Sequence, residues 1–304
     1  MSPARARSLP ERVREACAAV AAQAQHVTVA ELEAGRYAAT LEPMRAAGHG
    51  ACHDDAAVTA AAAGDRELAA ARVICLNAVN FGSGWWPTIR KLPGGSGYDT
   101  IAAGLDGRFA GHGHWSARQL QELTAESLAR ALGQEPAHPL ISRYLTSLSD
   151  VGAHVEREYG CSFAAVVESA GGSVVRLADT LGSWDAYADV SRYHGRDVPL
   201  YKRAQLAGAE ARAAGLLPGA DVGALTAFAD NLVPHVLWID GVLRIDRALR
   251  RSIDAGDLLE HGSPEEVELR ACTVHAVELL ADALGRRRVP AQIDELLWHR
   301  GRGA

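Results

Sequence analysis

The sequence predicts a mainly α-helical protein, organised as a single helical domain over residues 1–304. Alanine, leucine, glutamate and arginine dominate the composition, and all four are good helix formers. Few runs alternate between apolar and polar residues with the period of two that marks a strand. No Pro-, Gly- or Ser-rich linker divides the chain, and 48% of its residues are apolar, which suffices for one sizeable core.

Capping boxes mark four helix starts, where a Ser or Thr side chain accepts the N3 amide and a Glu or Gln reaches back. These are Ser8 with Glu11, Thr28 with Glu31, Ser116 with Gln119, and Ser263 with Glu266. Pro264 fills the first position of the last helix, and Gly285 is its predicted stop. Further helices are expected near residues 56–79, 99–109, 139–159, 163–181, 200–214, 221–232 and 290–299. Residues 1–8 are expected to be flexible.

Residues 236–246 are open to two interpretations. Asp240-Gly241 stands between two apolar runs, a pattern that favours a β-hairpin. The helix-rich sequence on either side of these residues favours a helix–turn–helix instead.

Charge and cysteine usage exclude several classes of protein. The formal net charge of -6 disfavours a nucleic-acid polymer as partner, because that affinity rests on Lys and Arg neutralising phosphates. No apolar stretch approaches the roughly 18–20 residues of a bilayer span, and no secretory apolar region follows the N-terminus. Five scattered cysteines without a C-x-x-C pair indicate reduced thiols. We therefore expect a cytoplasmic monomer without a membrane partner, and a local basic pocket for one small phosphate is still compatible with this balance.

Two segments carry polar and aromatic side chains that suit a flat heterocyclic base. Asn77 and Asn80, beside Phe81, could recognise such a base through amide donors and acceptors. Tyr187 and Asp189 could stack on it and hydrogen-bond to it. Each segment also has a structural alternative. Asn77 and Asn80 could cap the end of a helix beside packed aromatics, and Tyr187 with Asp189 could belong to a solvated loop anchored by its aromatics.

Two further segments carry charged residues at helix ends where the helix dipole opposes their charge. Lys202 and Arg203 begin a predicted helix, where a cation opposes the helix dipole but could hold a phosphate together with free backbone N–H groups. Asp230 lies in apolar company near the end of the predicted helix 221–232, where the negative helix end makes its charge costly. Such a carboxylate caps a helix, pairs with a cation or takes part in chemistry. The alternative for Lys202 and Arg203 is an ordinary helix start on the surface, and the alternative for Asp230 is a structural carboxylate.

Metal and cofactor signals are weak. His49, Cys52 and His53 are metal-ligand residue types, but no second Cys/His pair completes a closed site, and His112 and His114 are similarly isolated. The sequence has no G-x-S-x-G, no Walker loop and no dinucleotide fingerprint. We expect no metal and no organic cofactor.

In order along the chain, these segments resemble the queuosine salvage protein family, whose members hydrolyse queuosine 5′-phosphate and release queuine for tRNA modification. The likeness spans about residues 53 to 299. Its most specific parts are Tyr201-Lys202-Arg203-Ala204-Gln205, Phe228-Ala229-Asp230 and Glu266-Val267-Glu268-Leu269-Arg270. Asn80-Phe81, Ser96-Gly97-Tyr98, Tyr187-x-Asp189, Ile293-Asp294 and Leu297-Trp298 add to it.

The resemblance implies a fold similar to helix–hairpin–helix DNA glycosylases, and Leu217-Pro218-Gly219 is a short pattern of that kind. It also implies that Asp230 acts as nucleophile or transition-state stabiliser, and that Tyr187 with Asp189 holds the base. His53 matches a His near the substrate, and Asn80 lies in a matching segment, so we expect substrate contacts from both.

Three positions depart from the family's usual pattern. Asn77 stands where Asp is common, Asn231 follows the catalytic Asp where Tyr is common, and His235 follows Pro where Gln is common. Asn231 and His235 would adjoin the pocket, so they bear on the identity of the substrate more than on the reaction type.

The expected mechanism follows from the bond that is cleaved. Loss of the base develops oxocarbenium charge on the ribose, which a fixed carboxylate such as Asp230 stabilises. A 7-deazapurine has no N7 to protonate, so Asp189 would assist its departure at another atom. Lys202 would orient Asp230 or bind the 5′-phosphate. The alternatives are a noncatalytic or altered-specificity binder of a modified purine nucleotide, and a nucleic-acid glycosylase, which the acidic balance disfavours.

Overall fold

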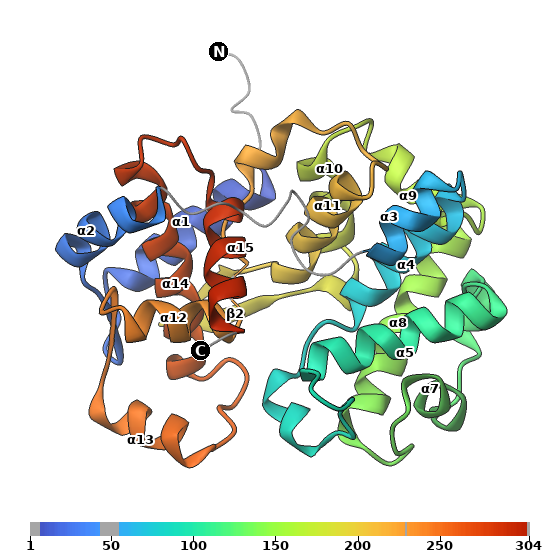
Figure 1. Ribbon diagram of the computed structural model, residues 1–304, viewed down its shortest axis with the longest axis horizontal. Helices are drawn as coiled ribbons and strands as arrows, with labels where there is room; N and C mark the ends of the chain where they lie inside the picture. Colours follow the sequence, from blue (N-terminus) through green and yellow to red (C-terminus); the bar gives the residue numbers. More distant parts are fainter. Residues whose placement is uncertain (1–6, 43–54, 229, 303–304) are drawn as a thin grey trace. The chain divides into compact units, whose positions relative to one another are not determined.

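The protein is mainly α-helical, which confirms the predicted fold class (Figure 1). The computed structural model describes residues 7–42, 55–228 and 230–302. These residues group into two compact units. The first unit takes its residues from 1–49, 189–205 and 220–304, and the second from 50–188 and 206–219. The single-domain organisation and the likeness to helix–hairpin–helix glycosylases stay predictions.

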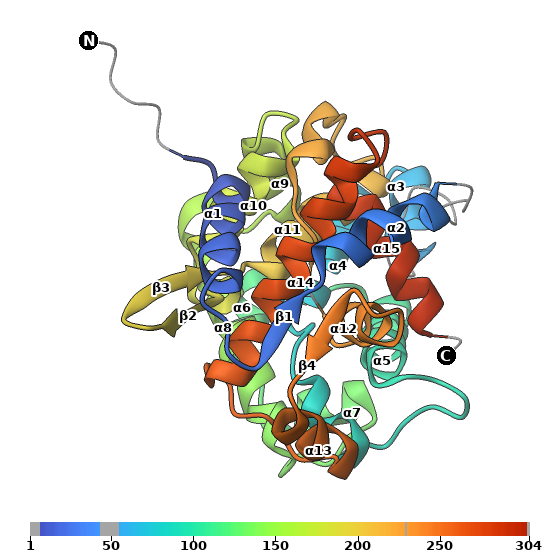
Figure 2. The same cartoon turned by 90° about the vertical axis from the view of Figure 1, so that its left-hand side faces the viewer.

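The first unit combines helices with two short antiparallel sheets. Its helices are α1 (Leu9–Ala21), α2 (Glu31–Leu41), the 3-10 helix η3 (Ala220–Ala224), α12 (Leu232–Ile239), α13 (Arg247–Ala255), α14 (Pro264–Ala283) and α15 (Pro290–Gly301). Its strands are β1 (Val27–Val29), β2 (Val190–Tyr193), β3 (Arg196–Pro199) and β4 (Leu243–Ile245). Strand β1 pairs with β4, Val27 lying opposite Ile245, and β2 with β3 forms a hairpin beside α1 (Figure 2).

Helix α14 is the centre of the first unit, because apolar residues occur on most of its faces. Helices α1, α2, α12 and α15 all pack against it. Ser263 accepts the N–H of Glu266 and Pro264 takes the first position, as predicted. The Glu266 side chain, however, bonds to the N–H of Gly262, so only half of the predicted capping box forms.

The second unit is built around α4, whose residues 69–78 are all buried. Helices α3, α5, α8 and α9 pack against it. The elements of this unit are α3 (Asp55–Ala62), α4 (Arg66–Ala78), η1 (Ser83–Thr88), α5 (Gly97–His112), α6 (Ala117–Gln121), α7 (Ala125–Leu132), α8 (Pro139–Tyr159), α9 (Phe163–Ser169), α10 (Val174–Gly182) and η2 (Asp185–Tyr187). Helix α11 (Lys202–Ala213) begins in residues of the first unit and continues in residues of the second.

Glycine interrupts two of the predicted long helices. The region 56–79 forms α3 and α4, separated at Gly64, which has a φ of +85°. The region 163–181 forms α9 and α10, separated at Gly171 and Gly172, which both have positive φ. Glycine adopts this left-handed conformation readily, and it ends a helix.

The predicted capping boxes are confirmed at Ser8 and Ser116 and wrong at Thr28. Thr28 lies within β1, and α2 begins at Glu31 after Ala30. Residues 236–246 combine the two interpretations left open by the sequence. Helix α12 runs to Ile239, and a turn at Asp240-Gly241 leads into β4, whose partner is the distant β1.

The flexibility expected of residues 1–8 falls mostly on residues 1–6, which lie outside the described residues, whereas Ser8 is the N-cap of α1. None of the helices in the described ranges has the length and apolar character needed to cross a membrane.

Candidate active site

Asp230 lies two residues before the first residue of helix α12, Leu232. Its Oδ1 accepts the N–H groups of Leu232 at 2.8 Å and Val233 at 3.2 Å, so the carboxylate caps this helix. The predicted helix 221–232 is wrong, because η3 ends at Ala224 and an irregular segment, residues 225–228, follows. Asp230 therefore faces the positive end of a helix dipole, where the sequence had predicted the negative end, and its charge is stabilised.

The second oxygen of Asp230 is available for chemistry. Within the described part of the chain, Oδ2 has no hydrogen-bond partner, and the residue is partly exposed. One oxygen thus fixes the orientation of the carboxylate, and the other can approach a reacting atom.

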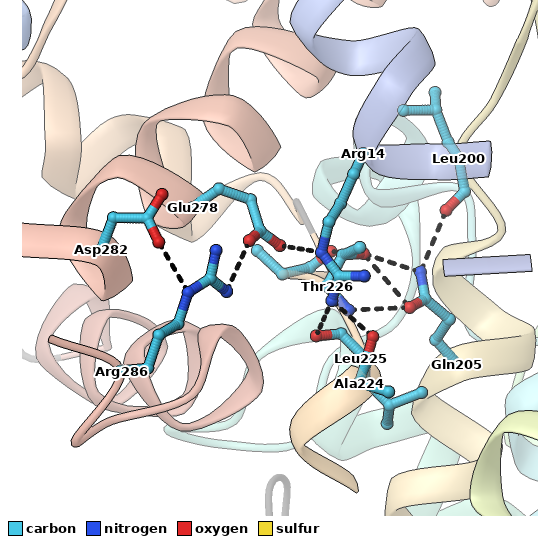
Figure 3. Close-up of polar contacts among 10 residues, drawn as sticks. Arg14, Leu200, Gln205, Ala224, Leu225, Thr226, Glu278, Asp282 and Arg286 are labelled. Carbon is cyan, nitrogen blue, oxygen red and sulfur yellow. Dashed lines mark hydrogen bonds and ion pairs between the residues drawn. The ribbon is translucent and has the colours of Figure 1, made fainter. Parts of the chain in front are cut away.

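Gln205 connects the start of α11 to the segment that precedes Asp230 (Figure 3). Its Oε1 accepts the N–H of Thr226 at 2.9 Å, and its Nε2 donates to the Thr226 hydroxyl oxygen at 2.9 Å. Both residues are fully buried, so water cannot replace these bonds. The two segments that carry Lys202 and Asp230 are therefore joined inside the first unit.

Arg14 of α1 holds the neighbouring backbone (Figure 3). Its Nη2 donates to the carbonyl oxygens of Ala224 and Leu225, and its Nε donates to Glu278 at 2.9 Å. Arg286 donates to the other Glu278 oxygen at 2.9 Å. Two cations therefore pair with the mostly buried Glu278, which anchors Arg14.

Lys202 is the first residue of α11 and follows Tyr201, which has a φ of +49°. The Lys202 N–H donates to Asp189 Oδ2 at 3.0 Å, so a protein carboxylate occupies the helix start where the sequence left room for a phosphate. The side chain is partly buried, and among the described residues its ammonium group enters no ion pair. It is therefore available to an anionic ligand.

Both oxygens of Asp189 are engaged within the first unit. Arg270 of α14 donates to Oδ1 at 2.9 Å and to Oδ2 at 2.7 Å. Burial raises the pKa of Asp189, but the charge and hydrogen bonds of Arg270 outweigh it and lower the pKa to about 2. This geometry favours positioning of the α11 start over the direct base contact that the resemblance implies.

A second carboxyl group lies near Asp230. Asp294 of α15 is 3% exposed, and its Oδ1 accepts the N–H of Phe228 at 3.1 Å. Burial and the charge of Asp230 raise the pKa of Asp294 to about 8, although the Phe228 N–H and the charge of Lys202 act against this. Lys202, Asp230 and Asp294 are thus coupled electrostatically.

The sequence carries a local signal for Asp294, which the motif-based prediction of site residues does not include. Asp294 is a carboxylate flanked by Ile293, Leu296 and Leu297 on one short helix. A charged residue on an apolar helix face is a candidate for a shifted pKa.

Two predicted substrate residues lie on the exposed side of α12. Asn231 immediately precedes the helix and His235 lies one turn further on, and both are exposed. Their spacing of four residues places them on the same helix face. The ring of His235 lies 5.9 Å from that of Trp238.

Tyr187, Asn77 and Asn80 belong to the second unit. Tyr187 is fully buried and its hydroxyl donates to the Ile74 carbonyl oxygen at 2.6 Å, an arrangement that favours packing over stacking on a base. Asn77 donates to Glu210 at 2.6 Å, and Asn80 is 6% exposed.

His53, expected near the substrate, lies outside the described residues, as do His49 and Cys52. Across the ranges that the structure describes, no group of three or more His, Cys, Asp or Glu side chains is placed to hold a metal ion.

Glu268 is a buried carboxylate whose hydrogen bonds hold the fold together. It accepts the N–H groups of Gln25 at 2.9 Å, His26 at 2.6 Å and Val27 at 3.0 Å, and the Tyr193 hydroxyl at 2.7 Å. Its hydrogen bonds connect α14 to the start of β1, and both of its oxygens are engaged.

The chain is similar to known proteins over most of its length. Residues 61–304 match the family described as Queuosine salvage protein. A Sphaerobacter thermophilus protein named queuosine 5′-phosphate N-glycosylase/hydrolase is 34% identical over 250 residues, covering 78% of this chain and 77% of the relative. A Dictyostelium discoideum protein of the same name is 29% identical over 77% of this chain and 73% of its own. A Bos taurus protein, also of that name, is 31% identical over 48% of this chain and 44% of its own.

Proposed function

Because this chain belongs to the queuosine salvage protein family, we propose that it hydrolyses the N-glycosidic bond of queuosine 5′-phosphate or a related 7-deazaguanine nucleotide. It is then a hydrolase, a nucleotide N-glycosidase, and the free base it releases feeds tRNA modification. The observation that carries the proposal is the carboxylate of Asp230, fixed through one oxygen at the start of α12 with the other oxygen available.

Asp230 acts on the ribose. As the bond between the anomeric carbon and the base nitrogen breaks, positive charge develops on the ribose ring, and the carboxylate stabilises it or bonds briefly to the anomeric carbon. Water then adds its hydroxyl to the anomeric carbon, and its proton balances the charge of the departing base. The preorganised carboxylate needs no reorientation during the reaction because Leu232 and Val233 already hold it.

Asp189 supports the reaction as an anion. With a pKa of about 2 it holds no proton at neutral pH, so it accepts hydrogen bonds and cannot protonate the departing base. The family resemblance assigns Asp189 to the base-binding site. Its bonds to Arg270 and to the Lys202 N–H indicate that it contributes there by positioning the start of α11.

The remaining substrate contacts follow from charge, exposure and family resemblance. Lys202 binds the 5′-phosphate, and Asn231 and His235 contact the substrate from the exposed side of α12. The resemblance assigns further contacts to Tyr187, Asn80 and His53. The net charge of -6 supports a small nucleotide over a nucleic-acid polymer as substrate. We further propose that the chain acts in the cytoplasm as a monomer, and that its two units work together as one domain.

Base release from a panel of substrates tests the proposed function. The full chain is incubated with queuosine 5′-phosphate, queuosine, guanosine 5′-phosphate and a queuosine-containing RNA, and mass spectrometry detects the free base. We expect the fastest release from queuosine 5′-phosphate, with or without a chelator. Tight nucleotide binding without release would support a noncatalytic binder, and release from the RNA alone would support a nucleic-acid glycosylase.

A further inference from the structure

Asp294 presents a buried oxygen atom that the proposed reaction does not use. Its Oδ1 accepts the N–H of Phe228, two residues before Asp230, whereas its Oδ2 is buried and has no hydrogen-bond partner within the described ranges. An ionised carboxylate would place part of its charge on this unpaired oxygen, at a high desolvation cost. A proton on Oδ2 removes that charge and leaves the bond to Phe228 intact.

The charged groups around Asp294 also oppose its ionisation on balance. Asp230, before α12, and Glu295, the next residue on α15, both carry negative charge, and the Lys202 ammonium at the start of α11 opposes them. Two nearby carboxyl groups that cannot both ionise divide into one charged and one neutral partner. Asp230 accepts two backbone N–H groups at a helix start, whereas Asp294 accepts one and has an unpaired oxygen.

We propose that Asp294 is a positioning residue for Asp230, and that it holds the chain at Phe228 in its neutral, protonated form so that Asp230 alone carries the negative charge of the site. This inference rests on the proposed function, because it assigns the negative charge of Asp230 to the stabilisation of the ribose cation. Deprotonation of Asp294 puts a second negative charge beside Asp230 and near Lys202, the cation proposed to bind the 5′-phosphate, so turnover falls at alkaline pH.

Three variants separate this role from the alternatives. Asn in place of Asp294 keeps the acceptor for Phe228 and mimics the protonated acid, whereas Ala removes both. Glu295→Gln is the matched control, because it neutralises the adjacent buried carboxyl group on the same helix. The catalytic efficiency, kcat/KM, is measured for each from pH 6 to pH 10 with queuosine 5′-phosphate.

The expected pH profiles differ clearly. The wild type loses about tenfold in kcat/KM at one pH unit above the pKa of about 8. Glu295→Gln keeps this alkaline loss but shifts it to lower pH, because the charge of Glu295 helps to raise the pKa of Asp294. Asp294→Asn rescues turnover at pH 7 to within about threefold of wild type and lacks this alkaline loss. Asp294→Ala loses about tenfold or more at every pH because Phe228 is no longer held. A hundredfold loss of kcat/KM in Asp294→Asn at pH 7 would overturn the positioning role and indicate that Asp294 donates a proton directly. If Asp294→Asn still lost activity at alkaline pH, that loss would belong to another titrating group.

Thermal unfolding reports on Asp294 without any substrate. A carboxyl group whose folded pKa lies above its unfolded value of about 3.9 loses stability as the pH rises from about 4 to about 8. The Tm of Asp294→Asn should therefore rise relative to wild type across this range. A constant Tm difference would overturn the neutral state of Asp294. Absence of turnover by the wild type would refute the proposed function, and this unfolding comparison then decides the protonation state by itself.

Discussion

The side-chain amide of Gln205 and residue Thr226 form a reciprocal pair, in which Gln205 accepts the Thr226 N–H and donates to its hydroxyl oxygen, each at 2.9 Å. Gln205 lies one helical turn after Lys202, and Thr226 lies four residues before Asp230. The pair therefore fixes the spacing between the cation proposed to bind the phosphate and the carboxylate proposed to act on the ribose.

Replacement of Gln205 should impair both stability and turnover. Gln205→Ala leaves the buried N–H of Thr226 without a partner, which costs about 1–3 kcal/mol, and it releases the segment that leads to Asp230. We expect a lower Tm and a kcat at least about tenfold lower. Gln134→Ala is the control, because Gln134 is also buried and also bonds a backbone N–H and carbonyl, those of Arg90, in the second unit. If Gln134→Ala lost as much kcat as Gln205→Ala, the loss in Gln205→Ala would reflect general destabilisation of the protein.

Asp230→Asn should abolish most turnover without unfolding the protein. Asn can still accept the N–H groups of Leu232 and Val233, but it lacks the charge that stabilises the ribose cation, so kcat should fall about 10²–10³-fold. Asp246→Asn is a matched control, since Asp246 caps α13 through N–H bonds from Ala248 and Leu249. Single-turnover base release measures both variants. Wild-type release by Asp230→Asn would make this carboxylate a helix cap only.

Lys202→Met should weaken binding of phosphorylated substrates selectively. A charge-assisted bond to the 5′-phosphate is worth about 1.5–3 kcal/mol, so KM for queuosine 5′-phosphate should rise about tenfold or more. KM for the unphosphorylated nucleoside should change little. The chain has two lysines, and Lys91→Met in the second unit is therefore the natural control. Equal increases in KM for both substrates would place Lys202 away from the phosphate.

Asp189→Asn should destabilise the first unit strongly. It leaves the buried guanidinium of Arg270 with Glu266 as its remaining carboxylate, at a cost of about 3 kcal/mol, and it disturbs the start of α11. Because the pKa of Asp189 is lowered to about 2, its stabilisation is present above pH 4 and is lost as the pH falls from about 4 to about 2. The Tm advantage of the wild type over the variant should shrink over that interval.

Asp106→Asn is the control for Asp189, because Asp106 makes the same two-oxygen pair with the buried Arg72 in the second unit. Both variants should lower the Tm, but only Asp189→Asn should also lower kcat at a temperature where both remain folded. Equal kcat values would show that the Asp189–Arg270 pair serves stability alone.

Helix starts and stops governed by neighbouring residues could be predicted from the sequence. The capping boxes at Ser8 and Ser116 form because their partners lie three residues away. Helix α8 occupies the predicted residues 139–159, beginning at a proline and ending at Gly160, which has a φ of +60°. Such signals depend on local bonds and backbone conformation alone.

The predicted helix 221–232 failed because distant residues satisfy its backbone. The N–H of Thr226 bonds to Gln205 and the N–H of Phe228 bonds to Asp294, so neither is used in a helical turn. Likewise, Thr28 could not cap a helix because its segment pairs with β4, more than two hundred residues later. No local pattern contains these partners.

The sequence by itself determined the mainly helical class and the family resemblance, since residue identity and order carry that information, and it nominated Lys202 and Asp230 as candidate site residues. The tertiary structure alone decided the electrostatic environment of three carboxyl groups. Asp230 accepts N–H groups at a helix start, Arg270 lowers the pKa of Asp189, and burial with the charge of Asp230 raises the pKa of Asp294. Burial and neighbouring charge set the pKa of a carboxyl group, and both arise only when distant segments pack together.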